Sequence, residues 1–259
     1  MTVNEDRPTI AIAGQHLAKR FGHVQALSDA SITVPSGKVV ALFGDNGAGK
    51  STFLKLLLGI HHKDQGDLVI ADKPVELHSV RDAQRLGVDC VYQDLALAPD
   101  LSVVDNMFLG HELTRGGAFG WAGFVNRSEM EQRADAALRD LSIKLPSLRV
   151  AVQELSGGQK QAVAVARAVM WSRTAVLMDE PTAALGARQS QIVCELMRTV
   201  AELGLGVLVV SHDLPRVLKV ADTVTILWRG KTALEAPAAG LTVPDVVSTM
   251  VGYQVEDAA

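Results

Sequence analysis

The sequence predicts an α/β domain built on a mostly parallel β-sheet. Short apolar runs rich in β-branched residues alternate with longer stretches of helical periodicity, as in a parallel sheet covered by helices. A glycine-rich loop lies between the first clear apolar run and the helix that follows it. From about residue 94 to residue 153 the strand pattern fades and helical patterns dominate, which predicts a helical insertion into the α/β core.

Five apolar runs predict buried parallel strands, because they are short, continuous and bounded by turn residues. In chain order they are 39–43, 88–92, 175–178, 206–210 and 224–228. Helices are predicted where the apolar pattern is longer and recurs every three or four residues, at 50–60, 128–141, 160–170 and 188–203. The glycine-rich segment 116–123 interrupts the helical middle and is predicted to be a surface loop, with a partner-contact loop as the alternative.

Composition limits the possible classes of protein. The 259 residues are 48% hydrophobic and 21% charged, enough to bury a substantial core, and the net charge of −4 argues against nucleic acid as the main partner. Cys90 and Cys194 match no disulfide or metal-ligand spacing, so we expect reduced core thiols and a reducing cytosol. The N-terminal residues do not resemble a secretory signal, and the apolar runs are too short to span a bilayer, so other chains would supply any membrane span.

The segment 44–52 predicts a phosphate-binding loop. Its glycines allow the tight turns that aim backbone N–H groups at a phosphate, and it joins a predicted strand to a predicted helix. Lys50 is expected to reach the β- and γ-phosphates, and Ser51 to ligate Mg²⁺. The residues predicted to surround the phosphates are Gly44, Asp45, Asn46, Gly47, Ala48, Gly49, Lys50, Ser51 and Thr52.

The predicted strand 175–178 leads into two carboxylates. Asp179 is predicted to hold the Mg²⁺ hydration shell, and Glu180 to act on the attacking water as general base or positioning group. Acidic residues after a strand are common turn formers, so the pair alone is weak evidence. Downstream of a phosphate loop the same pair predicts a nucleotide-hydrolysing site.

Residues 155–159, Leu-Ser-Gly-Gly-Gln, form a second glycine-rich turn before a predicted helix. Ser156 is a good N-cap residue, so helix capping explains it without any ligand. The alternative is contact with a phosphate, and the two roles are compatible. Two separate phosphate-binding segments in one chain suggest that the nucleotide is shared, for example between two copies of the protein.

These motifs, in this order, closely resemble the ATP-binding cassette (ABC) ATPases over essentially the whole chain. The finer resemblance is to the ATPases of bacterial monosaccharide importers, through segments 92–110 and 181–186. The resemblance implies a P-loop NTPase fold of the ABC type, in which residues 1–259 form one domain. That domain would have an N-terminal antiparallel β subdomain and a helical subdomain inserted at about 94–159. It also implies ATP and Mg²⁺ as cofactors, and ATP hydrolysis coupled to transport.

The resemblance also implies roles for residues that are ordinary by pattern alone. His212 would contact the γ-phosphate and the water-orienting carboxylate, and Gln93 would ligate Mg²⁺ or sense the γ-phosphate. Phe21 would stack on adenine, with a place in the core as the alternative. The signature residues expected to contact the γ-phosphate across a dimer interface are Ser156, Gly157, Gly158 and Gln159.

By the same resemblance, the expected partners are a second ATPase subunit, membrane permease subunits and an extracytoplasmic sugar-binding protein. The expected place is the cytoplasmic face of a bacterial membrane. The apolar residues that follow Gln93 are divided between the core of the helical subdomain and a groove for a permease helix. Gly186 stands where the family usually has Asp, so the resemblance does not imply the inter-subunit contact that this carboxylate makes. Many relatives fuse two cassettes, whereas this chain shows one and is expected to pair with itself or with a second ATPase.

Three other functions compete with sugar import. An ABC ATPase for another cargo fits the same motifs, because the ATPase does not touch cargo. A soluble ABC protein of DNA repair or translation usually carries coiled coils, zinc modules or tandem cassettes, which the sequence does not show. A P-loop kinase or GTPase conflicts with the segment 155–159. The pair His61-His62 resembles a metal site only superficially, and a solvated loop is the favoured prediction.

Overall fold

The computed structural model describes residues 9–115, 123–183 and 185–252. Nearly all of the glycine-rich segment predicted as a surface loop therefore lies outside the described residues. The chain divides into two compact units, residues 1–93 with 171–259, and residues 94–170. Across the described ranges, no helix is both long and apolar enough to cross a bilayer. The proposed insertion at 94–159 within a single domain stays a prediction.

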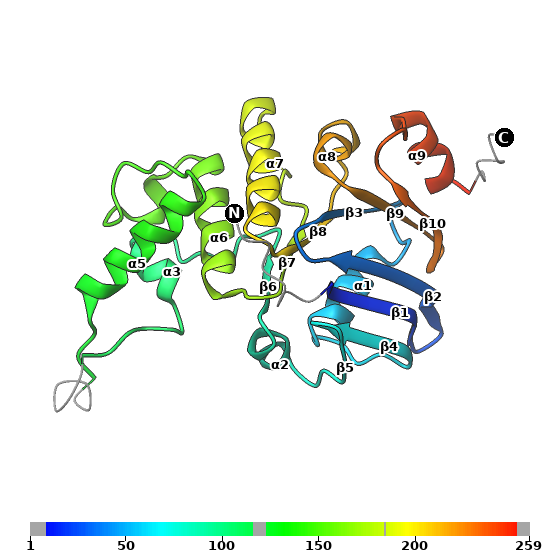
Figure 1. Ribbon diagram of the computed structural model, residues 1–259, viewed down its shortest axis with the longest axis horizontal. Coiled ribbons are helices and arrows are strands. Elements are labelled where there is room, and N and C mark those ends of the chain that lie inside the picture. The colour runs from blue at the N-terminus through cyan, green and yellow to red at the C-terminus, as the bar shows by residue number, and fades with distance from the viewer. Residues whose placement is uncertain (1–8, 116–122, 184, 253–259) are drawn as a thin grey trace. The chain divides into compact units, whose positions relative to one another are not determined.

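The described part of the larger unit contains a ten-stranded sheet in the order β5-β4-β1-β2-β10-β9-β3-β8-β7-β6 (Figure 1). Strands β9, β3, β8, β7 and β6 are parallel neighbours, whereas β1, β2, β4 and β5 pair antiparallel. The bounds are β1 (Ile10–Phe21), β2 (Val24–Pro35), β3 (Val39–Gly44), β4 (Gln65–Ile70), β5 (Lys73–Val75), β6 (Val88–Val91), β7 (Ala175–Asp179), β8 (Gly206–Val210), β9 (Thr223–Trp228) and β10 (Lys231–Pro237).

The five strands expected from continuous apolar runs are confirmed as β3, β6, β7, β8 and β9, with ends shifted by at most one residue. Every residue of β3 and β8 is buried, which explains why these strands are apolar throughout instead of alternating. The description "mostly parallel" holds for this part only. The N-terminal antiparallel strands were expected from the family resemblance and are confirmed.

Helices cover both faces of the parallel strands (Figure 1). Helices α7 (Ala187–Glu202), α8 (Leu214–Val220) and α9 (Val243–Met250) lie on one face, and α1 (Lys50–Leu57) packs on the other, between these strands and β1 and β2. Helix α2 (Val80–Arg85) contacts β6. The helix predicted at 50–60 ends at Leu57, because Gly59 adopts a left-handed conformation (φ 67°) that stops it.

The smaller unit is helical in its described residues, with α3 (Val103–Phe108), α5 (Arg127–Asp140) and a 3₁₀ turn, η1 (Val152–Glu154). Helix α6 (Gly157–Trp171) runs through the end of this unit. The only β pairing within those residues consists of two isolated bridges. Helix α6 begins three residues before the predicted start because Ser156 caps it, as described below.

Candidate functional site

The carboxyl ends of four neighbouring parallel strands carry the predicted chemistry. The phosphate loop follows β3, His212 follows β8, Asp179 ends β7 with Glu180 next, and Gln93 lies just beyond β6. The sheet order β3-β8-β7-β6 therefore brings together residues that are far apart in the chain. The registers that align these ends pair Leu42 with Val210, Asp179 with Val210, and Val91 with Met178.

The phosphate loop closes around the ammonium group of Lys50. Its Nζ donates hydrogen bonds to the carbonyl oxygens of Gly44 at 2.7 Å and Asp45 at 3.0 Å, and only 7% of the residue is exposed. Gly49 is the N-cap of α1 with φ 106°, and a Cβ there would lie 2.5 Å from Leu27 Cδ2. Because glycine offers no capping side chain, the amino end of α1 stays available to an anion, which fits a bound phosphate.

The charged side chains at this edge of the sheet affect one another's pKa values. Burial lowers the pKa of Lys50, and the nearby carboxylates of Glu180, Asp45 and Asp179 oppose that change. Burial also raises the pKa of Asp179, and the charge of Glu180 adds to it, against Lys55 and Lys50. A half-buried carboxylate beside a second one gains from a cation, which fits the predicted Mg²⁺ role of Asp179. Among the described residues, no group of three or more His, Cys, Asp or Glu side chains could hold a metal unaided, so a Mg²⁺ beside Asp179 would also need hydroxyl or amide side chains, phosphate oxygens or water as ligands.

Glu180 and His212 are in direct contact. His212 Nε2 lies 2.9 Å from Glu180 Oε1, and a carboxylate can only accept, so this nitrogen carries the proton. Glu180 has φ 49°, and its N–H donates to the Val210 carbonyl at 2.8 Å. A non-glycine residue rarely adopts this conformation, because it costs conformational free energy. Such strained residues are found where the surrounding structure fixes a side chain for function.

The two side chains border a pocket of about 260 Å³. Its other lining residues were not predicted from the sequence to be site residues, although all of them lie within three residues of Glu180 or His212 in the chain, and that proximity was the available signal. They are Thr182, Ala183, Ser211 and Asp213. The pocket gives a water molecule room beside Glu180.

Phe21 lies at the end of β1 and is 41% exposed. The alternative that placed it in the core is therefore wrong. The ring of His61 packs edge-on against it, with centroids 5.1 Å apart and planes at 68°, and Lys19 Nζ lies 5.5 Å from the ring centre. An exposed aromatic face held by two neighbours is suited to stacking on a purine base.

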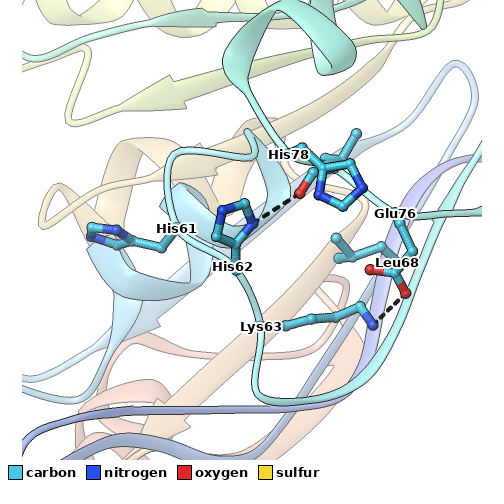
Figure 2. Close-up of a pocket in the computed structure, with 7 residues that line it drawn as sticks. His61, His62, Lys63, Leu68, Glu76 and His78 are labelled. Carbon is cyan, nitrogen blue, oxygen red and sulfur yellow. Dashed lines mark hydrogen bonds and ion pairs between the residues drawn. The ribbon is translucent and has the colours of Figure 1, made fainter.

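A separate pocket has a volume of about 200 Å³, and His61 is one of the residues that line it. Figure 2 shows the arrangement of its lining side chains. His62 donates from Nδ1 to the Leu77 carbonyl at 3.3 Å, and its ring centroid lies 5.8 Å from that of His78. Lys63 and Glu76 form an ion pair of 2.7 Å at the pocket edge. The ring of His61 instead packs against Phe21, so the side chains of the adjacent residues His61 and His62 contact different residues.

The second glycine-rich motif forms a reciprocal cap at the start of α6. Gln159 donates from its backbone N to Ser156 Oγ at 3.4 Å, and the Ser156 N–H donates to Gln159 Oε1 at 3.0 Å. The capping role expected of Ser156 is therefore present. Phosphate contact by the same residues remains compatible with it, since Ser156 is exposed and Gln159 is only partly buried.

Both cysteines are buried and free, as expected from their apolar surroundings. Burial raises the pKa of the Cys90 thiol well above its usual range and that of Cys194 to about 11. Neither thiol is activated for chemistry at neutral pH.

A phosphate loop, a strand that ends at Asp179 and is followed by Glu180, a histidine just after the neighbouring strand and a Leu-Ser-Gly-Gly-Gln turn define an ATP-binding cassette. The family profile described as ABC transporter matches residues 27–183. The chain belongs to the ABC transporter family, as one of its ATP-hydrolysing subunits.

Relatives and solved structures agree with this assignment. The chain is 43% identical to the xylose/arabinose import ATP-binding protein XylG of Sulfolobus acidocaldarius, covering 91% of each chain. It is 40% identical to the fructose import ATP-binding protein FrcA of Rhizobium meliloti, covering 93% of this chain and 94% of that one. A nucleotide-free ATP-binding cassette from an ABC transporter superposes with a TM-score of 0.80 at 22% identity, over 96% of this chain and 100% of that structure.

Proposed function

We propose that this chain hydrolyses ATP to drive import of a monosaccharide through separate membrane subunits. The observation that carries the ATPase part is the shared carboxyl edge of β3, β8, β7 and β6, with Lys50 inside the phosphate loop and Glu180 paired to His212. The sugar part rests on the two relatives with more than 90% mutual coverage, which are named for xylose/arabinose and fructose import.

Each residue has a defined task in this proposal. The N–H groups of the phosphate loop and Lys50 bind the phosphates, and the exposed face of Phe21 stacks on adenine. Ser51, Asp179 and Gln93 would hold Mg²⁺, which would supply positive charge to balance the charge that develops on the phosphates. Glu180 positions the attacking water and accepts its proton, and His212 holds the Glu180 carboxylate in place.

The site is completed by a second subunit, whose Ser156–Gln159 segment contacts the γ-phosphate. A dimeric ATP-binding cassette in a post-hydrolysis state with ADP and phosphate has the same fold, with a TM-score of 0.71 at 23% identity over 89% of this chain. Mixing Lys50→Ala chains with Ser156→Arg chains tests the arrangement, because a mixed dimer keeps one site with both halves intact. Activity above that of either variant alone is expected. Strict additivity, with activity linear in protein concentration, would contradict a shared site.

The cargo is tested by transport. Affinity-tagged chain is purified from its native membranes, the co-purifying chains are identified, and the complex is reconstituted in vesicles. ATP-dependent uptake of xylose, fructose and ribose is then compared with uptake of an amino acid. Stimulation of the ATPase by one sugar and its binding protein is expected, and Glu180→Gln complexes serve as the control. Uptake of the amino acid without uptake of any sugar would contradict sugar import and would favour the alternative, an ABC ATPase for another cargo.

The permease is proposed to dock on the segment after Gln93. Of its apolar residues, those in α3 are fully buried and belong to the core, whereas Leu101 is 39% exposed and Leu97 half-buried. Leu97→Asp should weaken co-purification with the permease, or uncouple transport, while ATP binding persists. A misfolded variant would place Leu97 in the core, and normal transport would place the docking site elsewhere.

A further inference from the structure

Two consecutive residues just after Gln93 adopt a left-handed backbone conformation. Leu95 has φ 62° and Ala96 has φ 46°, and neither is glycine. Side chains with a Cβ disfavour this region, so two in succession persist only where neighbouring groups hold them.

One guanidinium holds both residues. Arg167 on α6 donates from Nη1 to the Ala96 carbonyl at 2.7 Å and from Nη2 to the Leu95 carbonyl at 2.9 Å. These are short, charge-assisted hydrogen bonds, and the planar fork of arginine suits two adjacent acceptors. The left-handed turn is what brings the two carbonyls to the same fork.

Asn106 on α3 fixes the other end of the segment. Its side chain is fully buried and accepts from the Ala98 N–H at 2.7 Å. Its Nδ2 donates to the carbonyls of Ala98 at 3.0 Å, Leu101 at 3.2 Å and Ser102 at 3.0 Å. The stretch from Leu95 to Ser102 is therefore clamped by one side chain at each end, instead of being a free loop.

We infer that Arg167 is a positioning residue of the ATPase, which ties the loop that begins at Gln93 to the helix that begins at the Ser156–Gln159 motif. Leu95 is two residues from Gln93, and Arg167 lies about three turns along α6 from its first residue. A displacement of α6 therefore moves the Leu95 and Ala96 carbonyls, and through the chain it moves Gln93. The inference rests on the proposed roles of Gln93 and of the motif at Ser156.

The test exploits the freedom of glycine. Arg167→Met is made in the native chain and in a chain carrying Leu95→Gly and Ala96→Gly. In the native chain, a misplaced loop should lower kcat by about 10- to 100-fold, with unchanged ATP affinity. Glycine adopts the left-handed conformation without the steric penalty of a Cβ atom. In the glycine background, Arg167→Met should therefore lower kcat much less than it does in the native chain. Arg167→Lys keeps the charge but loses the fork, and should be intermediate.

A matched control is Arg173→Met, because Arg173 Nη2 also donates to a carbonyl, that of Arg85 at 3.1 Å, but near the amino end of β7. This variant should leave kcat unchanged. Amide hydrogen exchange at Ala98, whose N–H donates to Asn106 Oδ1, should accelerate in Arg167→Met and match that of the native chain in Arg173→Met.

An equal loss of kcat in both backgrounds would show that Arg167 acts elsewhere and would overturn the inference. Unchanged exchange of the Ala98 amide in Arg167→Met would do the same. If Arg167→Met does not fold, the comparison of backgrounds is made with Arg167→Lys. Absence of ATPase activity in the native chain would contradict the proposed function itself, whereas a fully active native chain with additive variants would contradict only the clamp.

Discussion

Replacing Glu180 by glutamine removes a negative charge and a proton acceptor but hardly changes the shape of the side chain. The amide oxygen can still accept from His212 Nε2 across the present 2.9 Å, and the backbone bond to Val210 is untouched. Folding and the position of the side chain should therefore survive. The loss should fall on the chemical step.

The magnitude follows from the role of the carboxylate. Removing a positioned general base typically lowers kcat by about 10²- to 10⁴-fold, which corresponds to about 3–5 kcal/mol of activation free energy. Binding should be preserved, since Asp45 and Asp179 still oppose the effect of burial on the pKa of Lys50. Loss of the Glu180 charge also removes one of the causes that raise the pKa of Asp179, which favours the ionised form of Asp179. An ATP-bound dimer should accumulate.

The assay combines phosphate release at saturating ATP with fluorescent-nucleotide binding and size exclusion in ATP. Glu202→Gln, an exposed position on α7, is the matched control and should keep native kcat. A Glu180→Gln chain with kcat within about threefold of native would refute the reasoning, because loss of a general base should lower kcat far more than that. Loss of ATP binding would instead show that Glu180 organises the site.

Three further outcomes are expected. Gly186 is the N-cap of α7 without a capping side chain, so Gly186→Asp should stabilise the fold by about 0.3–1 kcal/mol in urea unfolding, whereas Gly186→Ala, which cannot cap, should not. Gly49→Ala should lower the free energy of unfolding by roughly 2–4 kcal/mol and abolish ATP binding, because φ is 106° and the new Cβ would lie 2.8 Å from the Ala26 carbonyl oxygen. Burial would raise the pKa of Asp222, but the Val39 N–H, Arg198 and Lys38 outweigh it and leave that pKa lowered. Its stabilisation is therefore present above the unfolded pKa of about 3.9 and lost as pH falls through the folded pKa, so the unfolding free energies of native and Asp222→Asn chains should converge towards pH 3.

Sequence patterns were sufficient for the parallel half of the sheet. Strands buried on both faces must be apolar at every position, so β3 and β8 stand out without any knowledge of their neighbours. The antiparallel strands β1 and β2 alternate less cleanly and contain bulges, and only the family resemblance predicted them. Helix α3 was hidden because its apolar residues, Val103, Val104, Met107 and Phe108, could equally have lined an exposed groove.

For the candidate site, the sequence by itself determined the local chemistry: the glycines that allow the phosphate loop, the carboxylates after β7 and the cap at Ser156. Each depends on residues close together in the chain. Only the tertiary structure decided which of these groups meet. The order β3-β8-β7-β6 places Glu180 against His212, and the packing of α6 places Arg167 on the carbonyls of Leu95 and Ala96. Such contacts join residues separated by 32 to 72 positions, and they exist because sheet pairing and helix packing close long loops that no local pattern records.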